Sequence, residues 1–179
     1  MGVLSRVWDL LRPRRSSPSP GTVRVPSPSP RAGGTAPRRT DAASVVEVAL
    51  PPAGGLSLAY RPRPDVLPDP GEVVWARVPY AEDPSQGKDR PLLVLARADA
   101  ESSWAMKLTS RPHAGHRDHL PLGAGEWDRE GRPSWLDVDQ IYLVPAGAIR
   151  RTAGAVDRSV YLRVAGQLAQ RYGWRVAGR

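Results

Sequence analysis

Short hydrophobic runs separated by polar segments rich in proline and glycine fill the chain from about residue 70 onward, and they predict strands. The first run, residues 71–80, contains valines and a tryptophan, follows Asp69-Pro70-Gly71 and closes near Pro79. The second run, Leu92 to Ala96, is apolar throughout. A run so short and uninterrupted predicts a strand that is buried on both faces.

The segment between these two strands, residues 81–89, is polar and contains Pro and Gly, which predicts a loop. Arg90 is therefore expected where a polar loop enters a buried strand. Pro91 follows it and cannot donate a hydrogen bond to a neighbouring strand, which suits the first residue of a strand.

The strand pattern continues toward the C-terminal end. Residues 102–110 predict a third strand with three apolar side chains on one face, because side chains alternate along a strand: Trp104, Met106 and Leu108. A short strand at 120–122, a fourth strand at 135–144 and a connection at 145–155 are expected to follow.

On the fourth strand, Asp137 and Asp139 would share one face with Trp135 and Ile141. The last element is a predicted helix over residues 157–172, with Asp157 as its N-cap. Its apolar stripe is expected to consist of Val160, Tyr161, Val164, Leu168 and Tyr172.

The N-terminal region has a different composition. Residues 1–12 carry apolar side chains at helical spacing and predict a short amphipathic helix. Residues 13–43 are rich in Ser, Pro and Arg and lack the large apolar side chains that offset chain entropy, so we expect a disordered linker. Residues 44–68 predict either an edge hairpin or a further linker, which leaves residues 69–174 as the folded domain.

Two interpretations of the first helix are open. It either docks on the domain or frays, or its apolar face and basic flank give residues 1–15 a weak contact with a membrane surface. A secretory signal is not expected, because its longer apolar region and its small-residue cleavage site are both missing.

The net positive charge of the chain indicates which kinds of binding partner it attracts. The net charge is +8 and the sequence pI is about 10.7, so the chain attracts polyanions such as nucleic acid, an acidic protein or an anionic membrane face. The sequence contains no Cys, which excludes disulfides and Cys-based metal sites and fits a cytoplasmic protein.

The central pair of strands resembles the MazF/PemK family of toxin ribonucleases. Gly71-Glu72-Val73-Val74-Trp75 and Arg90-Pro91 match the family's Gly-acidic-apolar-Val-Trp strand and its Arg-Pro motif, in a form closest to a high-GC bacterial branch. The resemblance covers roughly residues 60–174. It implies a mainly β fold with a terminal helix, a small half-open SH3-like barrel of the PemK/CcdB toxin type.

The resemblance also implies an activity: sequence-specific, metal-independent cleavage of single-stranded mRNA, without a cofactor, by a toxin of a toxin-antitoxin system. In such a reaction the ribose 2′-hydroxyl attacks the adjacent phosphate, and the transition state spreads negative charge over phosphate oxygens. The chemistry needs a proton acceptor, a proton donor and fixed positive groups. Arginine suits the last role because its planar fork makes two hydrogen bonds to phosphate.

The family pattern assigns roles to specific positions. Arg90 would stabilise the charged phosphate, the Thr109 hydroxyl would bind it, and Asp139 in Asp139-Gln140 matches the family's Asp-Gln. PemK-type toxins place an Arg two residues before that Asp, whereas this chain has Asp137. The remaining expected RNA contacts are Lys88, Lys107, Ser110, Arg111 and Arg132.

The histidines of the chain all fall in one seven-residue segment, at His113, His116 and His119. His113 follows Thr109 closely and titrates near neutral pH, so it is a further candidate for proton transfer. A solvated loop that contacts RNA phosphate or nothing is the alternative. A metal site is not expected, because the spacing does not put all of them on one helical face and no Cys accompanies them.

The resemblance implies a homodimer and a cognate antitoxin that blocks the RNA groove. The rival interpretation is a non-catalytic nucleic-acid- or protein-binding module on the same barrel, with Asp137 marking lost catalysis. A gyrase-inhibiting toxin, which has a related barrel, is a weaker rival because Arg90-Pro91 and Thr109 argue against it.

Overall fold

The computed structural model describes residues 43–62, 67–111, 115 and 117–177. The predictions for residues 1–12 and 13–42, and those for His113 and His116, lie outside the described residues. The described part is mainly β with one long helix near its C-terminal end, as predicted.

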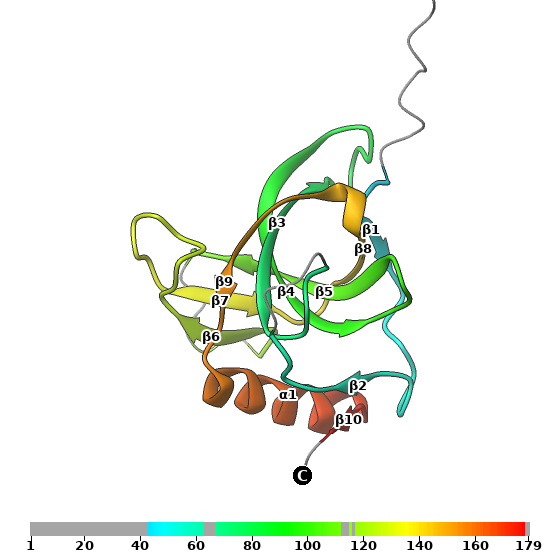
Figure 1. Ribbon diagram of the computed structural model, residues 1–179, viewed down its shortest axis with the longest axis vertical. Coiled ribbons are helices and arrows are strands. Elements are labelled where there is room, and N and C mark those ends of the chain that lie inside the picture. Colours follow the sequence, from blue (N-terminus) through cyan, green and yellow to red (C-terminus); the bar gives the residue numbers. More distant parts are fainter. Residues whose placement is uncertain (1–42, 63–66, 112–114, 116, 178–179) are drawn as a thin grey trace, which may run out of the picture. The chain divides into compact units, whose positions relative to one another are not determined.

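One eight-stranded sheet forms the body, in the order β1-β8-β5-β4-β3-β9, with β7 pairing with both β5 and β6. Figure 1 shows β3, β4, β5, β8 and β9 curling around a common centre, as in a small half-open barrel. The strands are β1 (Val46–Val48), β3 (Glu72–Pro79), β4 (Gly87–Arg97), β5 (Ser102–Thr109), β6 (His119–Gly123), β7 (Ser134–Asp137), β8 (Ile141–Pro145) and β9 (Ile149–Ala155). A 3₁₀ turn, η1 (Ala146–Ala148), links β8 to β9.

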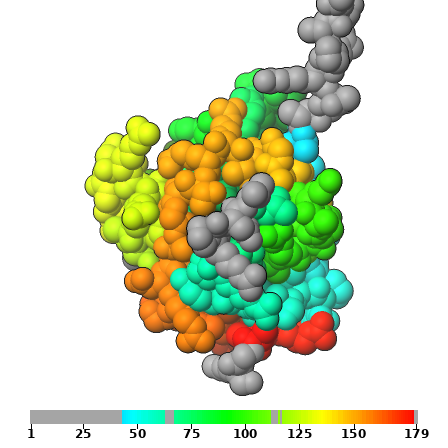
Figure 2. All heavy atoms as spheres, in the orientation of Figure 1, coloured from blue at the N-terminus to red at the C-terminus, as the bar shows by residue number. Residues whose placement is uncertain are grey.

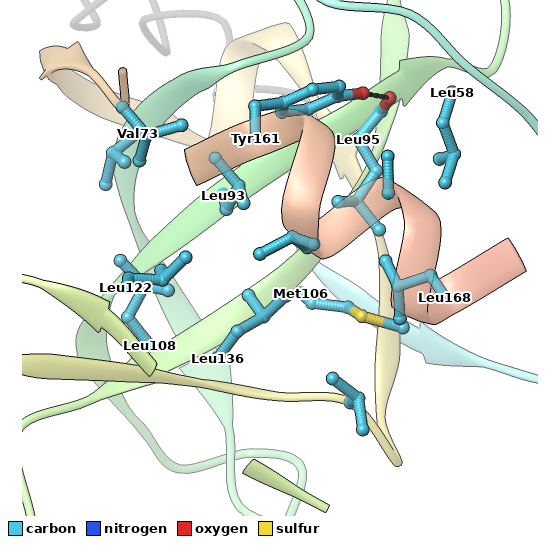
Figure 3. Packing of buried hydrophobic residues seen from close by; sticks show 14 of the residues in the cluster. Leu58, Val73, Leu93, Leu95, Met106, Leu108, Leu122, Leu136, Tyr161 and Leu168 are labelled. Carbon is cyan, nitrogen blue, oxygen red and sulfur yellow. Dashed lines mark hydrogen bonds between the residues drawn. The ribbon is translucent and has the colours of Figure 1, made fainter. Parts of the chain in front are cut away.

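Buried apolar residues form two clusters, because β3, β4 and β5 alternate side chains between two covered faces. The smaller cluster contains Val74, Leu92, Val94 and Tyr142. The larger cluster contains Leu93, Leu95, Met106 and Leu108 together with the helix residues, as Figure 3 shows. The prediction that Leu92 to Ala96 is buried on both faces is confirmed, since all its residues are at most 5% exposed.

Helix α1 (Arg158–Tyr172) covers the larger cluster. It buries Tyr161, Val164, Ala165 and Leu168, and the Tyr161 hydroxyl donates a hydrogen bond of 2.7 Å to the Leu95 carbonyl oxygen on β4 (Figure 3). Gly173 ends the helix in the left-handed conformation, φ 71°, which glycine adopts at little cost. Beyond it, β10 (Arg175–Val176) pairs in parallel with β2 (Ser57–Leu58).

The predicted loop between the first two strands is shorter than expected. β4 begins at Gly87, so Arg90 lies within the strand, opposite Ala76 on β3, rather than at the strand's entrance. Pro91 is likewise internal, opposite Trp75. Proline is tolerated there because the β4–β5 ladder starts only at Leu92, so Pro91 lies just outside it.

The predicted fourth strand is two strands. β7 and β8 both run along β5 but are interrupted at residues 138–140, where the Asp137 carboxylate accepts a hydrogen bond from the Asp139 backbone N–H. Asp137 and Asp139 therefore do not share one strand face. This local Asp–backbone contact competes with the ladder, as short acidic side chains often do.

Two further predictions need correction. Residues 145–155 are not a plain connection, because β9 pairs with β3 and forms one end of the sheet order. Residues 44–60 do not form a hairpin, because β1 pairs with β8 whereas β2 pairs with β10. In both places a long-range partner determines the pairing, which local patterns do not reveal.

Candidate nucleic-acid interface

A groove of about 470 Å³ opens where β4 extends beyond its ladder with β5. The register of that ladder ends at the Leu92–Lys107 pair, while β4 continues to Gly87 with β3. We call it the cationic groove, because five basic and three acidic residues line it. Its lining consists of Trp75, Lys88, Asp89, Arg90, Pro91, Ser110, Trp127, Asp128, Arg129, Glu130, Arg132, Ser134 and Arg151.

Arg90 lies in this lining, half-buried on β4. It makes no ion pair with any residue that the structure describes. It also lies near Tyr142 of the smaller cluster. Burial raises the pKa of the Tyr142 phenol, the charges of Glu47 and Asp137 add to that rise, and the positive charge of Arg90 opposes it. Arg90 thus presents a charged fork at the boundary between core and groove.

Ser110 lines the groove with Arg90, whereas Thr109, the last residue of β5, is not in the lining. Thr109 pairs with Trp135 on β7, two residues past the last β4–β5 pair, Leu92–Lys107. The Thr109 hydroxyl oxygen accepts a 3.2 Å hydrogen bond from the Arg111 backbone N–H. This bond is a turn contact at the end of the strand, and it leaves the hydroxyl hydrogen as a donor.

Lys88 and Arg132, both predicted RNA contacts, also line the groove. Arg132 is held at 2.9 Å by Asp128 and at 3.1 Å by Glu130. Burial acts to raise the pKa of Asp128, but hydrogen bonds from Arg132 and from the Glu130 backbone outweigh it and lower the pKa below its usual value. These acidic residues fix Arg132 and at the same time reduce the positive field at that end.

Lys107 does not line the groove. Its ammonium lies 3.2 Å from the Asp137 carboxylate and donates to the Gln140 side-chain oxygen. Gln140 in turn donates to Glu47 at 2.9 Å. Asp137, the departure from the PemK pattern, is therefore half of an ion pair with a predicted RNA contact.

Asp139 is also absent from the groove lining. Its carboxylate accepts a hydrogen bond of 2.6 Å from Arg171 on α1, and the same guanidinium donates to Asp118 at 2.6 Å. Both carboxylates are about half exposed. The arrangement ties the ends of β6 and β7 to the helix. Arg111 follows β5 and is exposed. Its backbone N–H, not its side chain, donates the hydrogen bond to the Thr109 hydroxyl.

Several lining residues were not predicted as site residues, and four of them are aromatic or basic: Trp75, Trp127, Arg129 and Arg151. The Arg151 guanidinium lies over the Trp75 ring, 4.8 Å from its centroid. In Figure 2 the yellow segment around residue 130 projects beside the orange surface of β9. Only the pairing of β9 with β3 brings Arg151 to the groove, so no local signal would have revealed it.

A second groove, of about 750 Å³, contains none of the predicted site residues. It is lined by the exposed Val46 and Tyr80, among others, and we call it the apolar groove. Within the described ranges no cluster of three or more His, Cys, Asp or Glu could hold a metal ion. None of the helices in that same part of the chain is long and apolar enough to span a membrane.

Comparison with known proteins shows which family this chain belongs to. Residues 69–171, more than half of the chain, match the model of the PemK-like, MazF-like toxin of type II toxin-antitoxin systems. The chain belongs to this toxin family. None of the curated proteins matches the sequence.

Similar solved structures include a MazE–MazF complex from Deinococcus radiodurans, with 23% identity and a TM-score of 0.46, covering 62% of this chain and 99% of that one. The Mycobacterium tuberculosis toxin MazF-mt6 has 16% identity and a TM-score of 0.44, covering 57% and 97%. An endoribonuclease from a mycobacterial species has 17% identity and a TM-score of 0.44, covering 60% and 92%.

Proposed function

We propose that this toxin is a metal-independent endoribonuclease that cleaves single-stranded mRNA at a short sequence by attack of the ribose 2′-hydroxyl. The observation that carries the proposal is the position of Arg90. It lies with Lys88 and Ser110 in a net-positive groove of a toxin-family domain. Clustered cations of this kind attract the RNA backbone.

Arg90 would stabilise the phosphate. Its guanidinium is half-buried, which strengthens its interaction with a charge that develops on phosphate oxygens during the reaction. The fork can make two parallel hydrogen bonds to that group. Lys88 and Ser110 on the same wall would hold the neighbouring backbone, and the Thr109 hydroxyl would donate to a phosphate oxygen.

Asp139 and His113 are the candidates for the proton acceptor and donor. Asp139 is paired with Arg171 outside the groove lining, so its proposed role requires the RNA, or a second protomer, to extend that far. His113 stays a prediction. Lys107 and Arg111 lie on β5 or directly after it and would act as secondary phosphate contacts.

A non-catalytic binding module is the second candidate, and the Lys107–Asp137 ion pair favours it. A carboxylate at that position adds negative charge where the PemK pattern has a cation, which would weaken stabilisation of a phosphate transition state. The same groove would then bind RNA without cutting it.

The proposal includes partners and a place of action. Because this family belongs to type II toxin-antitoxin systems and two similar structures are MazE–MazF complexes, we propose a cognate antitoxin that covers this toxin's groove. We also propose that the toxin is a homodimer and that it acts on mRNA in the cytoplasm.

The test is to incubate the full chain with a long single-stranded RNA in EDTA and to map the fragment ends. The proposal expects cleavage at a short recurring sequence with 5′-hydroxyl ends, and loss of cleavage in Arg90→Ala. Binding without cleavage would overturn the enzyme proposal in favour of the binding module.

A further inference from the structure

Trp75 and Arg151 form a cation–π pair in the wall of the cationic groove. They are register partners on β3 and β9, and the guanidinium carbon lies 4.8 Å from the ring centroid. We propose that this pair is a nucleobase-binding subsite, which holds the base of a nucleotide next to the phosphate at Arg90. The inference rests on the proposed function and extends it from phosphate binding to base recognition.

The surroundings of Arg151 distinguish it from an ordinary surface cation. Its neighbour Arg150 is ion-paired with Asp89 at 2.9 Å. The Arg151 side chain is exposed, lines the groove, and forms no ion pair or hydrogen bond with any residue in the described part of the chain. A guanidinium that lies over one face of an indole keeps its other side and its N–H donors for a ligand. Bases in single-stranded RNA bind to aromatic rings and guanidinium planes in this way.

The platform under Arg151 is held in place before any ligand arrives. The half-buried Trp75 ring packs against the larger core cluster. Its Nε1 is buried without a hydrogen-bond partner in the described residues, so packing and Arg151 hold the ring. A fixed platform costs little conformational entropy when a base binds to it.

The second tryptophan of the groove is also fixed. Trp127 is 4% exposed, and its Nε1 donates a hydrogen bond of 3.0 Å to the Ser134 hydroxyl. Its ring lies so close to Gly125 that a side chain there would come within 2.2 Å of it. Trp127 therefore forms a rigid part of the lining that restricts how a base can enter.

The subsite is close to the proposed chemistry. Trp75 lies opposite Pro91, and the next residue on β3, Ala76, lies opposite Arg90. Neighbouring residues of a strand point to opposite faces, so Arg90 and Trp75 reach the groove from the two faces of the β3–β4 pair. Both line the cationic groove together with Arg151, so a nucleotide whose phosphate contacts Arg90 can place its base at Trp75 and Arg151 within the same groove.

The experiment measures binding separately from cleavage. The ligands are a single-stranded 2′-O-methyl RNA, which lacks the attacking hydroxyl, and a 2′-O-methyl strand of the same length from which every base has been removed. The full chain, Arg151→Ala and Arg150→Ala are titrated with both at one salt concentration, with circular dichroism to verify folding. Arg150→Ala is the matched control, since it removes the same charge from the adjacent position.

We expect Arg151→Ala to weaken binding of the base-containing strand roughly 5- to 100-fold, the scale of one stacked base, and binding of the base-free strand only a few-fold. Arg150→Ala should weaken both strands by the same small factor. Equal weakening of both strands by Arg151→Ala would overturn the subsite, because Arg151 would then act only on phosphates.

Cleavage of unmodified RNA, measured in parallel, separates this inference from the proposed function. Cleavage by the wild type without base-dependent loss in Arg151→Ala would refute the subsite alone. Base-dependent loss without cleavage would support the subsite and refute the enzyme. Absence of binding to either strand would refute both.

Discussion

The two halves of β4 have opposite surroundings. From Leu92 to Ala96 the strand lies between β3 and β5 with both faces buried, and Tyr161 of α1 hydrogen-bonds its Leu95 carbonyl. From Gly87 to Arg90 it pairs with β3, lies outside the β5 ladder and lines the cationic groove through Lys88, Asp89 and Arg90. The segment from Gly87 to Arg90 carries the charges of the proposed site, whereas the segment from Leu92 to Ala96 stabilises the fold. Changes on the two sides should therefore affect different properties.

The largest expected effect is on the groove side. Arg90→Ala should lower the cleavage rate by about 10²- to 10³-fold, as loss of one transition-state donor does, while the unfolding temperature changes little. Arg90→Lys should recover only part of the rate, because an ammonium lacks the bidentate fork.

Arg77→Ala is the control for this change. Arg77 lies exposed on β3, opposite Asp89, and lines the apolar groove instead. Cleavage kinetics on one RNA compare the two variants. Equal losses of rate in Arg90→Ala and Arg77→Ala would mean that the general positive charge, rather than the position of Arg90, matters.

The second effect is on the helix side. Leu168 is fully buried on the inner face of α1. Leu168→Ala should lower the free energy of unfolding by about 2–5 kcal/mol, because apolar burial is lost and a cavity is left. Denaturant unfolding measures it. Cleavage per folded molecule should stay at the wild-type level, and a large loss there would show that the two halves of β4 are coupled.

A smaller effect is expected from Tyr161→Phe. This change removes the 2.7 Å hydrogen bond to Leu95 but keeps the ring, so the cost should be about 0.5–1.5 kcal/mol. Tyr172→Phe is a matched control on the same helix, since its hydroxyl donates to the Val138 carbonyl at 2.8 Å in a less buried place. A larger loss from the control would contradict this ranking.

The smallest effect concerns pH. The hydrogen bond from Arg171 lowers the pKa of Asp118 below its ordinary 3.8, so the ionised carboxylate favours the folded state. This contribution is present above that value and is lost as the pH falls through the lowered pKa. The unfolding temperature of Arg171→Ala should therefore be slightly lower than that of the wild type at neutral pH, and this difference should shrink in acid. A difference that grows in acid would exclude this ion pair as its cause.

Much of the fold followed from sequence, because strands buried on both faces leave an uninterrupted apolar run. The strand over 102–109 and α1 were predicted within a residue or two, and the run Leu92 to Ala96 was predicted as a buried strand, although β4 begins earlier, at Gly87. The predictions failed where the partner is distant. β9 carries Arg150 and Arg151 in a pattern typical of a connection, and only β3 makes it a strand.

The site could be predicted only in part. Arg90, Lys88, Ser110 and Arg132 do share one groove. Asp139 looked equivalent from its motif, yet Arg171 holds it outside the groove lining. The residues of β9 and of the 125–132 segment reach the groove through pairing and turns that no spacing encodes, so Arg151 and Trp127 were missed.

The central claim is that RNA binds in the cationic groove. The indole N–H resonances of an NMR spectrum test it directly when a cleavage-resistant 2′-O-methyl RNA is titrated in. We predict that the signals of Trp75 and Trp127 shift, while that of Trp174, which donates to the Pro51 carbonyl beside the helix, does not. Unchanged Trp75 and Trp127 signals, together with shifts in the backbone signals of Val46 and Tyr80, would place the RNA in the apolar groove and contradict the account.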